Sequence, residues 1–279
     1  MSTLSDLVGL SLGTRVVQYD EEDAILYALA VGARAEDLDL VLERRLRVLP
    51  TFAAALGLWA CDALAARGVF SPESALHGAQ TLEIRSPLPT RARLELHAGV
   101  AAVWDKGRSA VVDVETECEY FRAMYSIFLP GRGGWGGPRG VGSTPGSIID
   151  SEPTWVGGFL TTPEQAALYR LTGDRHLIHI DPDAARAAGL PGVILHGLCT
   201  LGIAAREIAA AVGAHPSDLR KLEARFASPV IPGAQLELRG SAGSGGLVRF
   251  SACSGDDTVL TAGRATFDIA AEPSPGSTH

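Results

Sequence analysis

Three histidines lie between residues 174 and 196, together with several aspartates, in a chain that has only 7 histidines. Five of these residues could do acid–base chemistry together. They are Asp174, His176, His179, Asp181 and His196. Apolar residues lie between them, so a solvated run of charges does not explain the stretch. An Asp and a His that face one pocket can divide the removal and the delivery of a proton between them. We therefore predict an acid–base site in a half-buried segment beside an apolar pocket.

The element that follows this stretch adds a hydrogen-bond donor. Gly197 begins a long apolar segment, which is expected to be a helix as far as Val212. The first N–H groups of a helix lack an intrahelical partner and lie at the positive end of its dipole. Such an N–H can hold the oxygen of a thioester as that oxygen gains negative charge. Together with Asp174 and His179, this donor suits proton chemistry next to a carbonyl group.

Other interpretations of the same residues remain open. Asp174 could cap a helix, His179 could be a hydrogen-bonded core histidine, and His196 could be no more than a neighbour of a helix cap. A metal site is a further alternative, with ligands among Asp174, His176, His179 and Asp181. The i, i+4 spacing that places two ligands on one helix face is absent, so we expect no metal.

The elements that position this site occur twice along the chain. Residues 86–96 and 228–238 align without a gap and share Ser, Pro, Ala, Leu, Glu and Leu at matching positions. Each is preceded by a predicted long apolar helix, Pro50–Ala66 or Gly197–Val212, and both are followed by alternating strands. A helix that is apolar on all sides needs a sheet around it. We therefore predict an α+β fold of two tandem antiparallel sheets, each wrapped around a long apolar helix.

The repeat divides the chain into units of unequal content. Residues 1–130 form a first unit that has no acid–base motif and shapes the pocket. Residues 131–150 are a Gly-rich linker, residues 151–270 are the second unit with the motif, and residues 271–279 are a disordered tail. One site per chain is therefore expected.

Two local predictions belong to the first unit and the linker. A further strand is expected around Leu38–Leu42. A phosphate-binding interpretation of the Gly-rich segment requires a helix after it, which Pro145 and Gly146 oppose. A linker is favoured, and it could also contact a ligand through Arg132 or Arg139.

Composition restricts the partners and the compartment. The net charge of -8 argues against a nucleic-acid backbone as the main partner. The 4 cysteines are widely separated and are expected to be reduced, as in a cytoplasmic protein. No apolar run approaches the roughly 20 residues that span a bilayer, and the first residues do not resemble a secretory signal. We expect a cytoplasmic protein with no membrane or nucleic-acid partner.

The stretch Tyr169–Pro182 resembles the signature of the type 2, (R)-specific enoyl-CoA hydratases, the MaoC-like dehydratases. That pattern reads Tyr-Arg-Leu-Ser-Gly-Asp-x-Asn-Pro-Leu-His-x-Asp-Pro, and later Pro-Ile-Leu-His-Gly-Leu-Cys-Thr. The similarity extends over nearly the whole chain and includes Leu76–Gly78, Ser86–Pro89, Asp105–Gly107 and Phe226–Gly233. The resemblance implies the two-domain, double hotdog form of the family.

The resemblance also implies a reaction and roles for the residues. Members add water reversibly, in a syn manner, to a trans-2-enoyl-CoA of fatty acid metabolism, and the product is the (R)-3-hydroxyacyl-CoA. By this resemblance Asp174 and His179 are the catalytic pair, and the Gly197 N–H is the oxyanion donor. The chain would be a carbon–oxygen hydro-lyase without metal or redox cofactor, and CoA would enter only as part of the substrate. Related folds pair their subunits and alternating strands leave unpaired edges, so a homodimer is expected.

Several positions depart from the family pattern. His176 stands where the family has Asn, Leu177 where it has Pro, and Ala79 where it usually has Glu. His176 would hold the site through one ring nitrogen, or would add a third titrating group.

These departures leave three functions open. The first is a hydratase for a bulky or unusual acyl group. The second is a dehydratase, or a related addition or elimination enzyme, of a polyketide, steroid or other specialised pathway, acting on a CoA or carrier-protein thioester. The third is a catalytically weak protein that binds acyl thioesters.

Overall fold

The structure, a computed structural model, describes residues 4–71, 74–140 and 152–268. Its strands form one ten-stranded sheet in the order β1-β3-β4-β5-β2-β7-β10-β9-β8-β6. The strands are β1 (Ser11–Tyr19), β2 (Leu76–Ile84), β3 (Ala92–Asp105), β4 (Ser109–Glu117), β5 (Phe121–Pro130), β6 (Trp155–Leu160), β7 (Leu219–Phe226), β8 (Gln235–Ala242), β9 (Leu247–Ser254) and β10 (Asp257–Phe267). The α-helices are α1 (Glu21–Ala30), α2 (Leu38–Val41), α3 (Phe52–Gly57), α4 (Trp59–Ala65), α5 (Gln165–Tyr169), α6 (Pro182–Ala187) and α7 (Gly197–Ala211).

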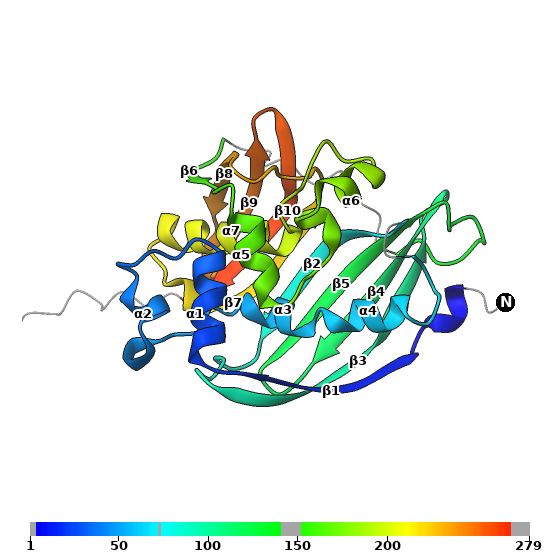
Figure 1. Cartoon of the computed structure of the whole chain (residues 1–279), viewed down its shortest axis with the longest axis horizontal. Coiled ribbons are helices and arrows are strands. Elements are labelled where there is room, and N and C mark those ends of the chain that lie inside the picture. The colour runs from blue at the N-terminus through cyan, green and yellow to red at the C-terminus, as the bar shows by residue number, and fades with distance from the viewer. Residues whose placement is uncertain (1–3, 72–73, 141–151, 269–279) are drawn as a thin grey trace, which may run out of the picture.

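The sheet consists of two five-stranded halves that meet in its middle. Strands β1 to β5 come from the first half of the chain, and β6 to β10 from the second. The halves join where β2 pairs antiparallel with β7, with Ala79 opposite Arg225 and Glu83 opposite Lys221 (Figure 1). The two predicted sheets are therefore continuous, because their inner edge strands hydrogen-bond to each other.

Each half packs helices on the sheet. In Figure 1, α3 and α4 follow one another across the strands of the first half, and the Tyr125 hydroxyl donates to the Ala54 carbonyl at 2.7 Å. The single helix predicted for Pro50–Ala66 is divided at Leu58, because the N–H groups of Leu58 and Cys61 bond only three residues back. Helix α7 is continuous and largely buried, as its apolar sequence predicted. None of the helices in the described ranges is long and apolar enough to cross a bilayer.

The strand predicted at Leu38–Leu42 is wrong. This segment forms the short helix α2, in which the N–H of Val41 bonds the carbonyl of Asp37 at 3.1 Å. The Asp37 carboxylate in turn accepts from the Arg34 N–H at 2.9 Å and closes a turn before the helix. The alternation of apolar and polar residues extends over only five positions, which is too short to exclude a single helical turn. In that turn Leu40 is the buried residue.

The Gly-rich segment is fixed to the first half as far as residue 140. The Asp105 carboxylate accepts from the N–H groups of Gly134 at 2.9 Å and Gly136 at 2.8 Å. These backbone donors and that of Gly107 lower the Asp105 pKa to about 2. The donors that a phosphate would need are therefore used by a protein carboxylate. The rest of the predicted linker and the predicted disordered tail, residues 271–279, lie outside the described residues.

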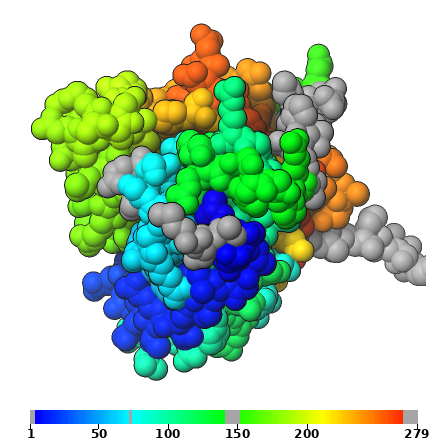
Figure 2. All heavy atoms as spheres, turned by 90° about the vertical axis from the view of Figure 1, so that its right-hand side faces the viewer, coloured from blue at the N-terminus to red at the C-terminus, as the bar shows by residue number. Residues whose placement is uncertain are grey.

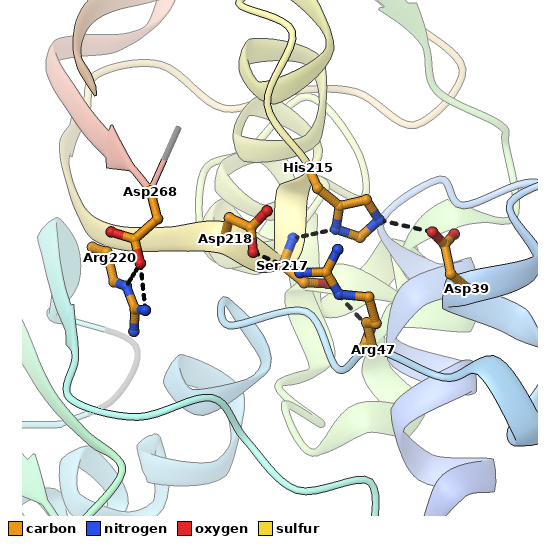
Figure 3. Close-up of polar contacts among 7 residues, drawn as sticks. All are labelled: Asp39, Arg47, His215, Ser217, Asp218, Arg220 and Asp268. Carbon is orange, nitrogen blue, oxygen red and sulfur yellow. Dashed lines mark hydrogen bonds and ion pairs between the residues drawn. The ribbon is translucent and has the colours of Figure 1, made fainter. Parts of the chain in front are cut away.

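Polar contacts also join the halves beside α7 (Figure 3). The ring of His215 contacts the Asp39 carboxylate at 3.0 Å, and Arg47 forms an ion pair with Asp218 at 2.5 Å. Figure 3 also shows Arg220 paired with Asp268 at the end of the second half. These contacts and the β2–β7 pairing hold the halves in one arrangement, on which a site formed by both depends.

Candidate active site

The motif predicted to carry the chemistry forms a series of tight turns between α5 and α6. A 3-10 turn, Arg170–Thr172, ends at Gly173, whose φ of +139° is a conformation that favours glycine. The next residue, Asp174, accepts a hydrogen bond from the His176 N–H at 3.1 Å. A second 3-10 turn, Leu177–His179, then brings His179 back towards Asp174. Asp174 therefore directly follows the turn that ends at Gly173.

Three ionisable side chains meet at the centre of the site. One ligand-type atom from each of Asp174, His179 and His196 lies within 4.8 Å of the other two. The rings of His179 and His196 are stacked, with centroids 3.7 Å apart and planes inclined by 24°. Asp174 and His179, predicted from the sequence, are therefore brought together, and His196 joins them.

The surroundings of His179 determine which of its nitrogens faces the reaction. Its Nδ1 lies 2.8 Å from the Ile194 carbonyl, which can only accept, so Nδ1 carries the proton. The lone pair of the neutral ring is then at Nε2. Burial lowers the pKa of His179, the charge of Asp174 opposes this, and His176 adds to the lowering. The ring is thus kept as a neutral proton acceptor at Nε2.

His196 is the N-cap residue of α7, but its side chain makes no capping hydrogen bond. Instead Nε2 donates to the Asp174 carbonyl at 3.2 Å, and the ring also packs on Tyr169 with centroids 4.8 Å apart. Burial and the neighbouring His179 lower the His196 pKa. A neutral ring at this place holds Asp174 without adding a charge beside His179.

Gly197 is placed where a backbone donor is available. It is the first residue of the 15-residue helix α7, and its N–H has no hydrogen-bond acceptor within the described ranges. A Cβ at this position would lie 3.0 Å from the Phe226 ring, closer than side chains normally pack. The glycine lets Phe226 approach while the free N–H stays at the positive end of the helix dipole.

A cavity of about 980 Å³ gives these groups access to a ligand. Asp174, His179 and Gly197 line it together with apolar residues of the second half such as Ile178 and Leu198. The first half supplies the opposite wall from β2 to β5. The cavity therefore needs both halves, and the acid–base groups come from the second.

His176 is adjacent to the cavity but is not one of the residues that line it. Its ring centroid is 6.2 Å from that of His179. Its Nδ1 accepts from the Ile178 N–H at 3.4 Å, so its side chain caps the turn that carries His179. An Asn side chain can cap a turn in the same way. The geometry thus favours a positioning role over that of a third acid–base group.

His77 on β2 lines the cavity, and the sequence did not single it out as a site residue. Its Nε2 is buried without a hydrogen-bond partner in the described structure, and its ring centroid is 4.8 Å from that of Phe226. Burial lowers the His77 pKa to about 4, although Asp174 raises it. The sequence offered one indication, a glycine directly after His77, because glycine inside a strand is typical of a bulge. The register of β2 does shift between His77 and Ala79.

Replacing His77 with Gln is expected to reduce acid destabilisation. A folded-state pKa of about 4, below the ordinary 6.5, means that the unfolded chain binds this proton more readily between those values. Stability is therefore lost as the pH falls from 6.5 to 4, by at most about 3 kcal/mol from this residue. Urea unfolding of both proteins across this range measures the difference. His97→Gln, at an exposed histidine, is the control. If the free energy of unfolding fell equally with pH in the wild type and in His77→Gln, the lowered His77 pKa would be contradicted.

Asp174, His179 and His196 are the described residues whose spacing could suit a metal ion. An imidazole lone pair lies in the ring plane, and the rings of His179 and His196 are stacked with their centroids 3.7 Å apart. One ion cannot lie in both planes near both nitrogens. Asp181, considered as a ligand from the sequence, instead accepts from the Asp183 N–H at 2.8 Å and caps α6. The donor set does not fit a metal ion in this arrangement.

Comparison with protein families assigns both halves of the chain. Residues 17–128 match the MFE-2 hydratase 2 N-terminal domain, and residues 146–256 match the MaoC like domain. The chain is 35% identical over 244 residues to 3-hydroxyacyl-thioester dehydratase Y of Mycobacterium tuberculosis, which covers 82% of this chain and 84% of that protein. It is also 35% identical over 248 residues to the peroxisomal enoyl-CoA hydratase 2 of Arabidopsis thaliana, over 78% and 80% of the two chains.

Solved structures agree with these assignments. The MaoC-like dehydratase of Phytophthora capsici superimposes with a TM-score of 0.85 at 26% identity, over 95% of this chain and 98% of that one. A conserved Mycobacterium tuberculosis protein described as a double hotdog fold gives a TM-score of 0.58 at 14% identity, over 90% and 92%. The predicted double hotdog fold is confirmed.

Proposed function

Because this chain belongs to the MaoC-like hydratase and dehydratase family, we propose that it adds water reversibly to a trans-2-enoyl-CoA and forms the (R)-3-hydroxyacyl-CoA. One observation carries the proposal: Asp174, His179 and the unpaired Gly197 N–H line a single cavity. An acid–base pair beside an oxyanion donor is what addition next to a thioester carbonyl requires. The similarity to a named 3-hydroxyacyl-thioester dehydratase supports the reverse direction, dehydration, at the same site.

The geometry suggests how each group acts. A water held between the Asp174 carboxylate and the His179 Nε2 gives up one proton as its oxygen bonds to C3. The electrons of the double bond move towards the thioester oxygen, where the Gly197 N–H stabilises the negative charge. His179 takes the water proton at Nε2 and returns a proton to C2 on the same face, so atoms and charge balance and addition is syn. The neutral state of His179 makes it the acceptor at the start of hydration.

Turnover of a series of enoyl-CoA thioesters of increasing bulk tests this function. We expect hydration with an (R) product, and the cavity of about 980 Å³ favours acyl groups larger than a short straight chain. We propose that neither metal nor redox cofactor takes part, so dialysis against EDTA should leave kcat within about twofold of the untreated value. Chiral analysis of the product and metal analysis of the dialysed protein provide the measurements. An (S) product, or activity that EDTA abolishes and a metal restores, would refute the corresponding part.

We further propose that the enzyme is a cytoplasmic homodimer. Four free cysteines support a reducing compartment. The described sheet ends at β1 and β6, whose outer edges are unpaired and available to a second copy. Light scattering of the purified protein tests the dimer and cell fractionation tests the compartment, and a monomer at micromolar concentration would contradict the former.

A further inference from the structure

Part of the cavity wall is formed by side chains of β4 and β5 in the first half of the sheet. These two strands carry none of the acid–base groups. Val111 on β4 lies opposite Phe128 on β5, and Asp113 lies opposite Ser126. Alternate residues of a strand point to one face, so these four side chains share a face. All four line the cavity. A ligand in the cavity therefore meets a polar pair, Asp113 and Ser126, next to an apolar one.

Asp113 is a buried acid, only 9% exposed. Its Oδ2 accepts from the Trp104 indole N–H at 2.6 Å, and its Oδ1 accepts from the Ser126 hydroxyl at 2.6 Å. A carboxylate has about four lone-pair positions, so two donors leave part of its accepting capacity unused. Asp113, Trp104 and Ser126 all line the cavity, so a ligand there can reach this carboxylate.

No described residue forms an ion pair with Asp113. Continuing across the sheet from Ser126, the next residues in register are Ala79 on β2 and Arg225 on β7. Arg225 is therefore three strand spacings from Asp113, about 14 Å between backbones, and its side chain is exposed. Ala79 offers no hydrogen-bonding side chain between them. A buried carboxylate without a cation is costly unless further donors reach it.

The polar group is held in place before any ligand binds. Gly140 packs against the indole of Trp104 so closely that a Cβ there would lie 2.7 Å from the ring. Gly140 belongs to the segment 131–140, which Asp105 anchors and which forms part of the surface coloured green in Figure 2. The Trp104 indole is therefore held on one side by its hydrogen bond to Asp113 and on the other by its contact with Gly140. Such pre-organisation is typical of a binding subsite.

We propose that Asp113 is a ligand subsite, in which its carboxylate accepts a hydrogen bond from an O–H or N–H group of the bound thioester, remote from the reacting double bond. The proposal rests on the proposed function, since it assumes a thioester in this cavity. Two parts of the ligand carry such donors: a hydroxyl group on the acyl chain, and the amide N–H groups of the pantetheine arm. A plain alkyl segment would bury the carboxylate without new donors and would be disfavoured.

The variant Asp113→Asn separates ligand recognition from folding. Its amide oxygen can accept from Trp104, and its amide N–H can donate to the Ser126 hydroxyl, so both internal contacts are kept. Glu115→Gln is the matched control, because Glu115 lies two residues along the same strand on the same face and pairs with Arg122, outside the cavity. Unfolding temperatures of both variants should stay near that of the wild type.

Calorimetric titration with saturated thioesters, which cannot be hydrated, tests the subsite without turnover. The ligands are an acyl-CoA, the same acyl-CoA with a hydroxyl group at its far end, and the S-ethyl thioesters of both acids. Asp113→Asn is expected to weaken binding of at least one donor-bearing ligand by about tenfold to a hundredfold, and to leave the plain ethyl thioester unchanged. A loss confined to hydroxylated acyl groups identifies the acyl hydroxyl, and a loss common to both CoA ligands identifies the pantetheine amides.

Equal affinities of wild type and Asp113→Asn for all four ligands would overturn the subsite. An equal loss of affinity in Glu115→Gln would also overturn it, since the effect would then come from removing any negative charge on this face and not from Asp113 itself. Failure of the proposed function looks different: the wild type would bind none of the CoA ligands, or would bind them without hydrating the unsaturated forms.

Discussion

Asp174→Asn and His179→Gln are each expected to lower kcat for hydration by about a thousandfold. Asp174→Asn removes the negative charge beside the water, and His179→Gln removes the basic Nε2 that accepts its proton. General acid–base groups contribute 10² to 10⁴ in rate, and here both act on one water. Loss of the enoyl-thioester absorbance measures the rate. Because the two residues act as a unit, the double variant should be hardly slower than either single one.

The controls for these variants are neighbours of the same type. Asp183→Asn changes an exposed acid just beyond the motif, and His97→Gln changes an exposed histidine on β3. Both should keep nearly the full rate. Binding of a saturated acyl-CoA should survive in Asp174→Asn and His179→Gln, since the cavity is otherwise intact. If either of those variants retained more than a tenth of the wild-type kcat, the residue's assignment as an acid–base group would be abandoned.

Gly197→Ala should have the second largest effect, a fall in kcat of about a hundredfold. Its Cβ would lie 3.0 Å from the Phe226 ring, so either the ring or the first turn of α7 must move. Movement of that turn withdraws the backbone N–H from the thioester oxygen, and loss of one oxyanion donor costs 10² to 10³ in rate. The defect should appear in kcat more than in KM, since the charge on the oxygen develops only in the transition state.

A second substitution separates this displacement from general damage to the helix. Phe226→Leu in the Gly197→Ala protein relieves the close contact and should recover part of the lost kcat. Gly202→Ala, farther along α7, would place a Cβ 2.6 Å from Val31 and should lower the unfolding temperature while the folded enzyme keeps its kcat. The explanation fails if Phe226→Leu restores nothing, or if Gly202→Ala reduces kcat as much as Gly197→Ala.

Several features of the fold and of the site were within reach of the sequence. The apolar run after Gly197 predicted α7, since a helix of this composition must be buried in any arrangement. The turn at Gly173 and the order of Asp174 and His179 depend on neighbouring residues only, so the motif indicated where the acid–base groups lie. The break in the first long helix at Leu58 follows directly after Gly57, a residue of low helix propensity whose signal the prediction of one continuous helix did not use.

The two interpretations that changed most are those of His176 and His196. As a substitution within the motif, His176 suggested an altered reaction site, but its side chain caps a local turn beside the cavity. His196 was considered no more than a neighbour of a helix cap, but its ring stacks on His179 and donates to the Asp174 carbonyl. Both outcomes depend on the direction in which a ring points, which residue type and spacing do not specify.

The sequence by itself determined the fold class, the repeat, and the local group formed by Asp174, His179 and Gly197, because each depends on periodicity or on residues close together in the chain. Only the tertiary structure decided that His77 and Asp113 also line the cavity. The β4–β5 pairing that places Asp113 opposite Ser126 is local, but the pairing of β2 with β7 that closes the cavity joins residues far apart in sequence. The register between such distant strands depends on how the whole sheet packs, so the sequence of one strand does not identify its partner.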